Sequence, residues 1–121
     1  MSSVIVQRWG MEPAEKKRIL DELGNIPEEL YNELVDCFLA DIPKKIEQLK
    51  TAIQNGNYKS IKAVSHGIKG VSANLRLDKL YELSRELELA GSNNEELAGI
   101  EKKFRIFLEA IDSFSFSWGR K

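Results

Sequence analysis

The chain has 121 residues, of which 18 are Lys or Arg and 19 are Asp or Glu, so its formal net charge at pH 7 is −1. This length predicts one domain that buries a single core without disulfides or bound metal. The balanced charge argues against nucleic acid, because nucleic-acid-binding proteins carry a marked basic excess. No apolar run approaches the roughly 20 residues of a membrane span, and the first residues lack the pattern of a secretion signal. We therefore expect a cytoplasmic monomer that binds neither nucleic acid nor membrane.

The single cysteine, Cys37, cannot form a disulfide within the chain, which fits a reducing compartment. Its neighbours on the expected helix are apolar, so we expect a small core side chain rather than a reactive thiol. The strand signal is weak, because short apolar and polar alternations occur only at residues 4–6 and 114–116. Elsewhere the apolar residues recur at spacings of three and four, which predicts helices.

A short first helix is expected from Pro13, because proline favours the first turn, to a stop near Gly24. It belongs to an N-terminal extension, residues 1–26, and should cover one end of the main bundle. The second helix begins at Pro27, and Pro43 inside it predicts a kink rather than two separate helices. Its apolar seam continues in phase past this proline and consists of Leu30, Leu34, Phe38, Ile42, Ile46, Leu49 and Ile53.

Three further helices complete the expected fold. The third covers about residues 57–75 and ends before Asp78, a plausible cap for the fourth helix, which stops near Gly91. The last helix starts with Glu95 after Asn94, and residues 115–121 form a tail that either frays or packs back on the bundle. Four amphipathic helices with short loops, residues 27–114, predict an all-α fold, an antiparallel up-down-up-down four-helix bundle with an additional N-terminal helix.

The third helix contains His66, the only histidine of the chain. At about 100° per residue, His66 falls opposite the apolar stripe, so its imidazole should point into water. A buried structural histidine would lie on the other face. The apolar stripe consists of Ile61, Val64, Ile68, Ser72 and Leu75, and the side of His66 carries Lys59, Lys62, Lys69, Gly70 and Ala73.

No enzyme active site can be assembled around His66. The neighbouring Ser65 does not face it, since adjacent residues on a helix point in different directions. One histidine cannot supply a zinc site or the paired Glu and His ligands of a carboxylate metal centre. The chain also has no GxxxxGK[ST] loop for phosphates. We therefore expect neither a kinase nor a hydrolase, and no metal or cofactor.

A neutral, exposed imidazole is a nucleophile that can accept a phosphoryl group. Lys69, on the next turn, could meet the phosphate oxygens through a charge-assisted hydrogen bond. Gly70 lies beside His66, although glycine inside a helix costs about 1 kcal/mol relative to alanine. Its bareness would let a partner approach the imidazole, and the alternative is tight packing against a neighbouring helix.

Glu88 is the candidate partner of His66 from the fourth helix. With the turn centred near Leu77, antiparallel helices bring His66 and Glu88 to the same level. Glu88 could then hydrogen-bond the imidazole and fix its tautomer. The alternative is an exposed carboxylate that pairs with Lys or Arg and contributes little.

The segment His66-Gly67-Ile68-Lys69-Gly70-Val71-Ser72-Ala73-Asn74-Leu75 resembles the H-x-[LI]-K-G-x-[SA]-[AS]-x-[LIF] motif of histidine-containing phosphotransfer (HPt) domains. Two further segments are similar to the L-E-x-A-G and F-x-x-[DE]-x-P patterns of this family. They are Leu87-Glu88-Leu89-Ala90-Gly91 and Phe38-Leu39-Ala40-Asp41-Ile42-Pro43. The resemblance covers about residues 30–107. One departure is Arg76, where many family members have a glycine that helps the following turn.

The resemblance implies a phosphorelay carrier. A response-regulator receiver domain would dock around His66, transfer its aspartyl phosphate to the imidazole, and a second receiver would take it away. A hybrid sensor kinase is a further expected partner, and Mg²⁺ would belong to the receiver rather than to this chain. Lys59, Lys62 and Ala73 would contact the partner, and the lysines would attract its acidic pocket, although a solvated lysine face is the simpler interpretation. A helical adaptor without phosphotransfer is the alternative function.

Overall fold

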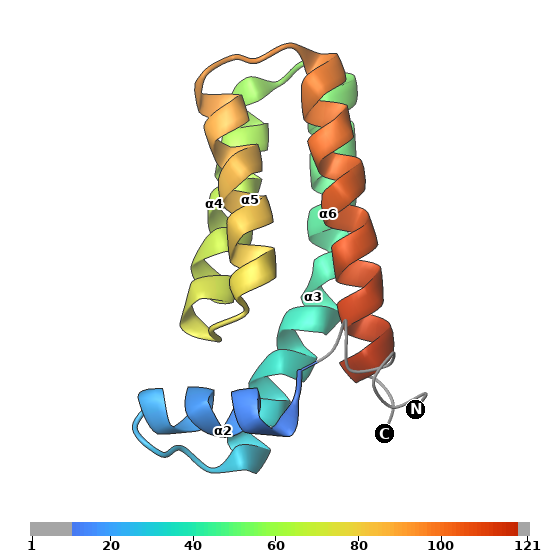
Figure 1. The fold of residues 1–121 in the computed structure, drawn as a ribbon. Helices are drawn as coiled ribbons and strands as arrows, with labels where there is room; N and C mark the ends of the chain where they lie inside the picture. Colours follow the sequence, from blue (N-terminus) through green and yellow to red (C-terminus); the bar gives the residue numbers. More distant parts are fainter. Residues whose placement is uncertain (1–10, 119–121) are drawn as a thin grey trace.

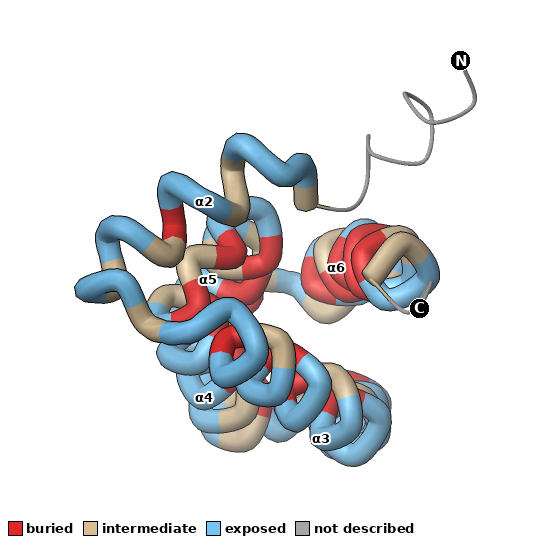
Figure 2. The backbone as a smooth tube through the Cα atoms, turned by 90° about the horizontal axis from the view of Figure 1, so that it is seen from below, coloured by how far each residue is buried: buried red, intermediate tan, exposed pale blue. Residues whose placement is uncertain are grey.

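The computed structural model describes residues 11–118 of the chain, and within this range it contains helices and no strand (Figure 1). Its helices are α2 (Pro13–Glu22), α3 (Glu28–Gln54), α4 (Tyr58–Asn74), α5 (Asp78–Ser92) and α6 (Leu97–Trp118). Helices α3 to α6 alternate in direction, and Figure 2 shows them end-on, arranged around the core in chain order. The predicted all-α four-helix bundle with an additional N-terminal helix is confirmed. The strand-like residues 4–6 lie outside the described range.

The buried residues of the four long helices lie on the sides of these helices that face the middle of the bundle (Figure 2). Helices α4 and α5 share the most extensive contact, and α3 packs on α4 while α6 packs on α5. Several of the largest core side chains are fully buried. They are Tyr31, Leu49, Ile61, Leu87, Ile100 and Phe107.

Helix α2 lies across the end of the bundle where α4 turns into α5 (Figure 1), as the sequence predicts. Its Ile19 is fully buried and belongs to the core. Two ion pairs fasten its polar side: Lys16 Nζ lies 2.9 Å from Glu28 Oε2, and Glu22 Oε1 lies 3.5 Å from Arg76 Nε. Helix α2 is therefore a docked part of the domain.

The predicted seam of α3 is wrong in its first two turns. Leu30 and Leu34 are 44% and 43% exposed, whereas Tyr31 and Val35 are fully buried. Each step of four residues rotates about 40° beyond a full turn, so a run of such steps leaves the buried face. Cys37 lies on this exposed side, and the prediction of a core cysteine is also wrong.

The ends of the helices follow the sequence signals only in part. Helix α3 passes through Pro43 as one helix, as predicted. The expected cap of α4 is present, because the Asn57 side chain accepts a hydrogen bond of 3.1 Å from Ser60 N. Asp78 is not a cap but the first residue of α5, and the capping position is Leu77, which makes no side-chain cap bond.

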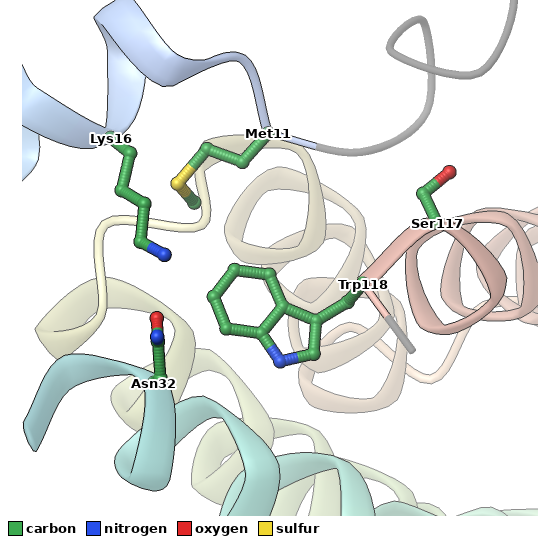
Figure 3. A pocket seen from close by; sticks show the side chains of 5 residues that line it. All are labelled: Met11, Lys16, Asn32, Ser117 and Trp118. Atoms are coloured by element: carbon green, nitrogen blue, oxygen red, sulfur yellow. The ribbon is translucent and has the colours of Figure 1, made fainter. Parts of the chain in front are cut away.

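Helix α6 begins at Leu97 rather than at Glu95 and continues to Trp118, beyond the predicted end of the bundle. The first part of the predicted tail is therefore helical. Trp118 Nε1 donates a 2.8 Å hydrogen bond to Asp36 Oδ1, and its ring contacts Tyr31 edge to face at 6.2 Å between centroids. Figure 3 shows the indole and the Lys16 side chain pointing into one cavity of about 260 Å³ between α2, α3 and α6. Trp118 thus packs back on the bundle.

Candidate functional site

Helix α4 presents the imidazole of His66 to solvent. The opposite face of this helix is buried, with Ile61 and Ser65 fully buried and Ile68 2% exposed. The His66 side chain is 66% exposed. The structure therefore places His66 on the exposed face that the helical spacing predicts.

Glu88 reaches His66 from the neighbouring helix α5. Its Oε2 lies 2.8 Å from His66 Nδ1, and its Oε1 lies 2.7 Å from Lys69 Nζ. The Glu88 side chain is only 14% exposed, so the carboxylate sits in the groove between the two helices rather than in open solvent. Glu88 therefore meets the imidazole at the level that the register predicts, and it also pairs with a lysine, but the alternative of an exposed carboxylate is wrong. The pairing of Lys69 with Glu88 was not predicted.

The charge of Glu88 determines the proton arrangement on the imidazole. The hydrogen bond from Lys69, and then the one from His66, lower the pKa of the Glu88 carboxyl below its ordinary value, against the opposing effect of burial. Glu88 is therefore ionised near neutral pH, and an ionised carboxylate can only accept hydrogen bonds. In neutral His66, Nδ1 must carry the proton that it donates to Glu88. This arrangement leaves Nε2 as the ring nitrogen with a free lone pair.

Gly70 offers open space beside His66. A Cβ added at Gly70 would meet no atom within 4 Å, and the residue is exposed. The alternative of tight packing against a neighbouring helix is therefore wrong. Gly67 also has no atom within 4 Å of an added Cβ.

The predicted partner-binding residues lie on the same face of α4. Lys59 and Lys62 are exposed and Ala73 is half-buried. Among the described residues, neither Lys59 nor Lys62 forms an ion pair, in contrast to Lys69. The face around His66 therefore combines two unpaired lysines with the open position of Gly70.

Gly91 is a residue whose importance the sequence did not reveal. It is buried on α5, and a Cβ placed there would lie 3.0 Å from Lys62 N and 3.1 Å from Ile61 Cγ2. Such distances are shorter than ordinary van der Waals contact. The sequence signals at Gly91 are its place at the end of the L-E-x-A-G pattern and after an apolar helical run, and such a glycine is equally typical of a helix end.

Arg76 takes the place of the glycine that many HPt domains have after their motif. It adopts the left-handed conformation with φ of 60°, and Arg76 N and Leu77 N donate to the carbonyls of Ala73 and Ser72 at 3.1 and 2.9 Å. These two hydrogen bonds end α4 in the same way as those at a helix end where a glycine takes the left-handed conformation. The Arg76 side chain also donates to Ala73 O at 3.0 Å. The departure from the motif therefore leaves the turn intact.

A family model described as the Hpt domain matches residues 33–114, which is more than half of the chain. The chain belongs to the HPt domain family. HPt domains are phosphocarriers that take part in histidine phosphotransfer in phosphorelays. They interact there with receiver domains and kinases, and they are neither kinases nor hydrolases themselves. The match begins within α3, so α2 lies outside it. Comparisons with curated proteins and with solved structures found no match.

Two further observations concern the described residues of this HPt domain. Residues 11–118 contain no group of three or more His, Cys, Asp or Glu side chains placed to hold a metal ion. None of the helices in this range is long and apolar enough to span a membrane.

Proposed function

We propose that this HPt domain accepts a phosphoryl group on His66 Nε2 from the aspartate of one receiver domain and passes it to the aspartate of another. The observation that carries this proposal is the 2.8 Å contact between Nδ1 of the exposed His66 and the ionised carboxylate of Glu88. It holds the proton on Nδ1 and leaves a free lone pair on Nε2. Such a nitrogen is ready to attack phosphorus.

In the forward step, the lone pair of Nε2 forms a bond to phosphorus as the bond between phosphorus and the aspartyl oxygen breaks. The aspartate leaves as a carboxylate, and the Nδ1 proton stays on the ring in its hydrogen bond with Glu88. The second transfer reverses these events, because the aspartate of the next receiver attacks and the pair of electrons returns to Nε2. Such transfers depend mainly on positioning and on charge stabilisation.

Lys69 supplies charge stabilisation in this proposal. Its ammonium group lies 2.7 Å from Glu88 before transfer and is only one turn from His66. When the phosphoryl group arrives, Lys69 turns from Glu88 toward the phosphoryl oxygens, which form charge-assisted hydrogen bonds with it. Glu88 keeps the imidazole oriented during this exchange.

The partner in this proposal is the acidic pocket of a receiver domain, which brings its own Mg²⁺, so the HPt domain contributes no metal. Lys59 and Lys62 attract that pocket, and Gly70 and Ala73 leave room for its approach to the imidazole. The proposal places the domain in the cytoplasm as a monomer.

The direct test is incubation of the protein with a receiver domain that carries a radioactive aspartyl phosphate. We expect label that is stable in alkali and labile in acid, as on a phosphohistidine, and none on His66→Gln. Because His66 is 66% exposed, His66→Gln should keep the helical circular dichroism and the unfolding midpoint of the wild type. If the wild type takes up no label from any receiver that binds it, the protein is an adaptor and the proposal fails. If His66→Gln unfolds, His66 has a structural role instead.

A further inference from the structure

Helices α4 and α5 approach each other closely at Gly91. A Cβ at this position would lie 3.0 Å from Lys62 N, 3.1 Å from Ile61 Cγ2 and 3.3 Å from Ile61 Cβ. Lys62 N and Ile61 Cβ are fixed to the backbone of α4, so neither can move away by a change of side-chain rotamer. Any residue larger than glycine must therefore separate the two helices locally by a few tenths of an ångström.

Gly91 lies close to the residue that orients His66. It follows Glu88 by three positions, about 4.5 Å along the axis of α5. Glu88 reaches across to His66 Nδ1 at 2.8 Å and to Lys69 Nζ at 2.7 Å. Hydrogen bonds of this kind span about 2.7–3.2 Å. A local separation of a few tenths of an ångström would therefore stretch both contacts toward the upper end of this range, about 3.2 Å.

We propose that Gly91 is a positioning residue for His66: its missing side chain sets the spacing of α4 and α5 at which Glu88 holds the proton on Nδ1. The inference rests on the proposed function, because a free Nε2 affects phosphotransfer only if that nitrogen accepts the phosphoryl group. Other glycines of the described helices make no such approach. At Gly67, Gly70 and Gly99 an added Cβ would meet nothing within 4 Å.

The test measures the tautomer of His66 in the unphosphorylated protein from its ¹⁵N ring resonances, at a pH where the imidazole is neutral. Wild type should carry the proton mainly on Nδ1. Gly91→Ala should shift the population toward the Nε2–H tautomer, and Glu88→Ala should shift it further. Gly99→Ala, the matched control in open space, should leave it unchanged. The double variant Gly91→Ala/Glu88→Ala should equal Glu88→Ala, because Gly91 acts through Glu88.

Phosphotransfer provides the second measurement. The rate of label uptake from a phosphorylated receiver should fall roughly tenfold in Gly91→Ala, less than the ~10²-fold that a 1 Å misplacement can cost.

A folded Gly91→Ala with the wild-type tautomer overturns the proposal, as does a wild-type tautomer in Glu88→Ala. If Gly91→Ala does not fold, Ile61→Ala/Gly91→Ala replaces it, since loss of Cγ2 makes room while the contact with Lys62 N remains. Because the tautomer is read without phosphate, failure of all phosphotransfer would refute the proposed function alone.

Discussion

A single carboxylate connects two of the candidate site residues of this HPt domain. Glu88 contacts His66 with one oxygen and Lys69 with the other. The antiparallel register, counted from the turn near Leu77, was enough to predict that Glu88 and His66 meet. The pairing with Lys69 could not be predicted, because the direction of a long, flexible side chain does not follow from spacing along the helix. The L-E-x-A-G pattern includes Gly91, but the tight contact there could not be predicted, since it depends on how closely two helices approach.

The lowered pKa of Glu88 makes a prediction for acid unfolding. The pKa of the Glu88 carboxyl is lower in the folded chain than in the unfolded chain, where it is about 4.5. Ionised Glu88 therefore stabilises the fold at pH values above 4.5, and this stabilisation is lost as the pH falls through the pKa of the folded state. Glu88→Gln cannot titrate, so its free energy of unfolding should decline less between pH 5 and pH 3 than that of the wild type. Urea unfolding at several pH values measures this, with Glu86→Gln on the exposed side of α5 as the control. Parallel pH profiles for wild type and Glu88→Gln would contradict the assignment.

At the level of the helices, the sequence predicted the number, the order and most of the ends of those within residues 11–118. Signals such as the Asn57 cap are local and act on the backbone directly. The predicted phase of α3 failed at Leu30 and Leu34, because a seam chosen at steps of four drifts around the helix. Only packing shows which face of α3 the helices α4 and α6 cover. The tail could not be assigned, since Trp118 is anchored by Asp36, a residue far away in the sequence.

The turn after α4 allows a test of backbone strain. Arg76 has a positive φ of 60°, which costs an L-residue roughly 1–2 kcal/mol and costs glycine almost nothing. Arg76→Gly and Arg76→Ala both lose the contacts with Glu22 and with Ala73 O. We therefore expect Arg76→Gly to be more stable than Arg76→Ala by about 1 kcal/mol in urea unfolding. Equal stabilities would mean that the strain is relieved by a different turn.

At the level of the whole molecule, a buried hydrogen bond ties the end of α4 to α3. Tyr31, which is fully buried, donates to Leu75 O at 2.7 Å, and burial raises the pKa of the Tyr31 hydroxyl to about 12. Tyr31→Phe leaves this carbonyl without its partner and should cost about 1–3 kcal/mol of unfolding free energy. Tyr58→Phe is the matched control, since its hydroxyl donates to Glu95 O at 2.8 Å in a partly exposed place where water can replace it. A larger loss in Tyr58→Phe than in Tyr31→Phe would contradict this prediction.

Because Lys69 is paired with Glu88, we expect Lys69 to act on a partner only at short range, and the unpaired Lys59 and Lys62 to act at long range. At 2.7 Å the two charges nearly cancel for a partner beyond the screening length of about 8–10 Å. We therefore expect the long-range attraction of an acidic receiver to come from Lys59 and Lys62. Lys59→Ala and Lys62→Ala should lower the association rate and flatten its dependence on salt, as stopped-flow binding would show. The double variant Lys69→Ala/Glu88→Gln removes both charges of the pair, so it should leave encounter almost unchanged and slow the transfer that follows. A reduced salt dependence of its association rate would contradict this division.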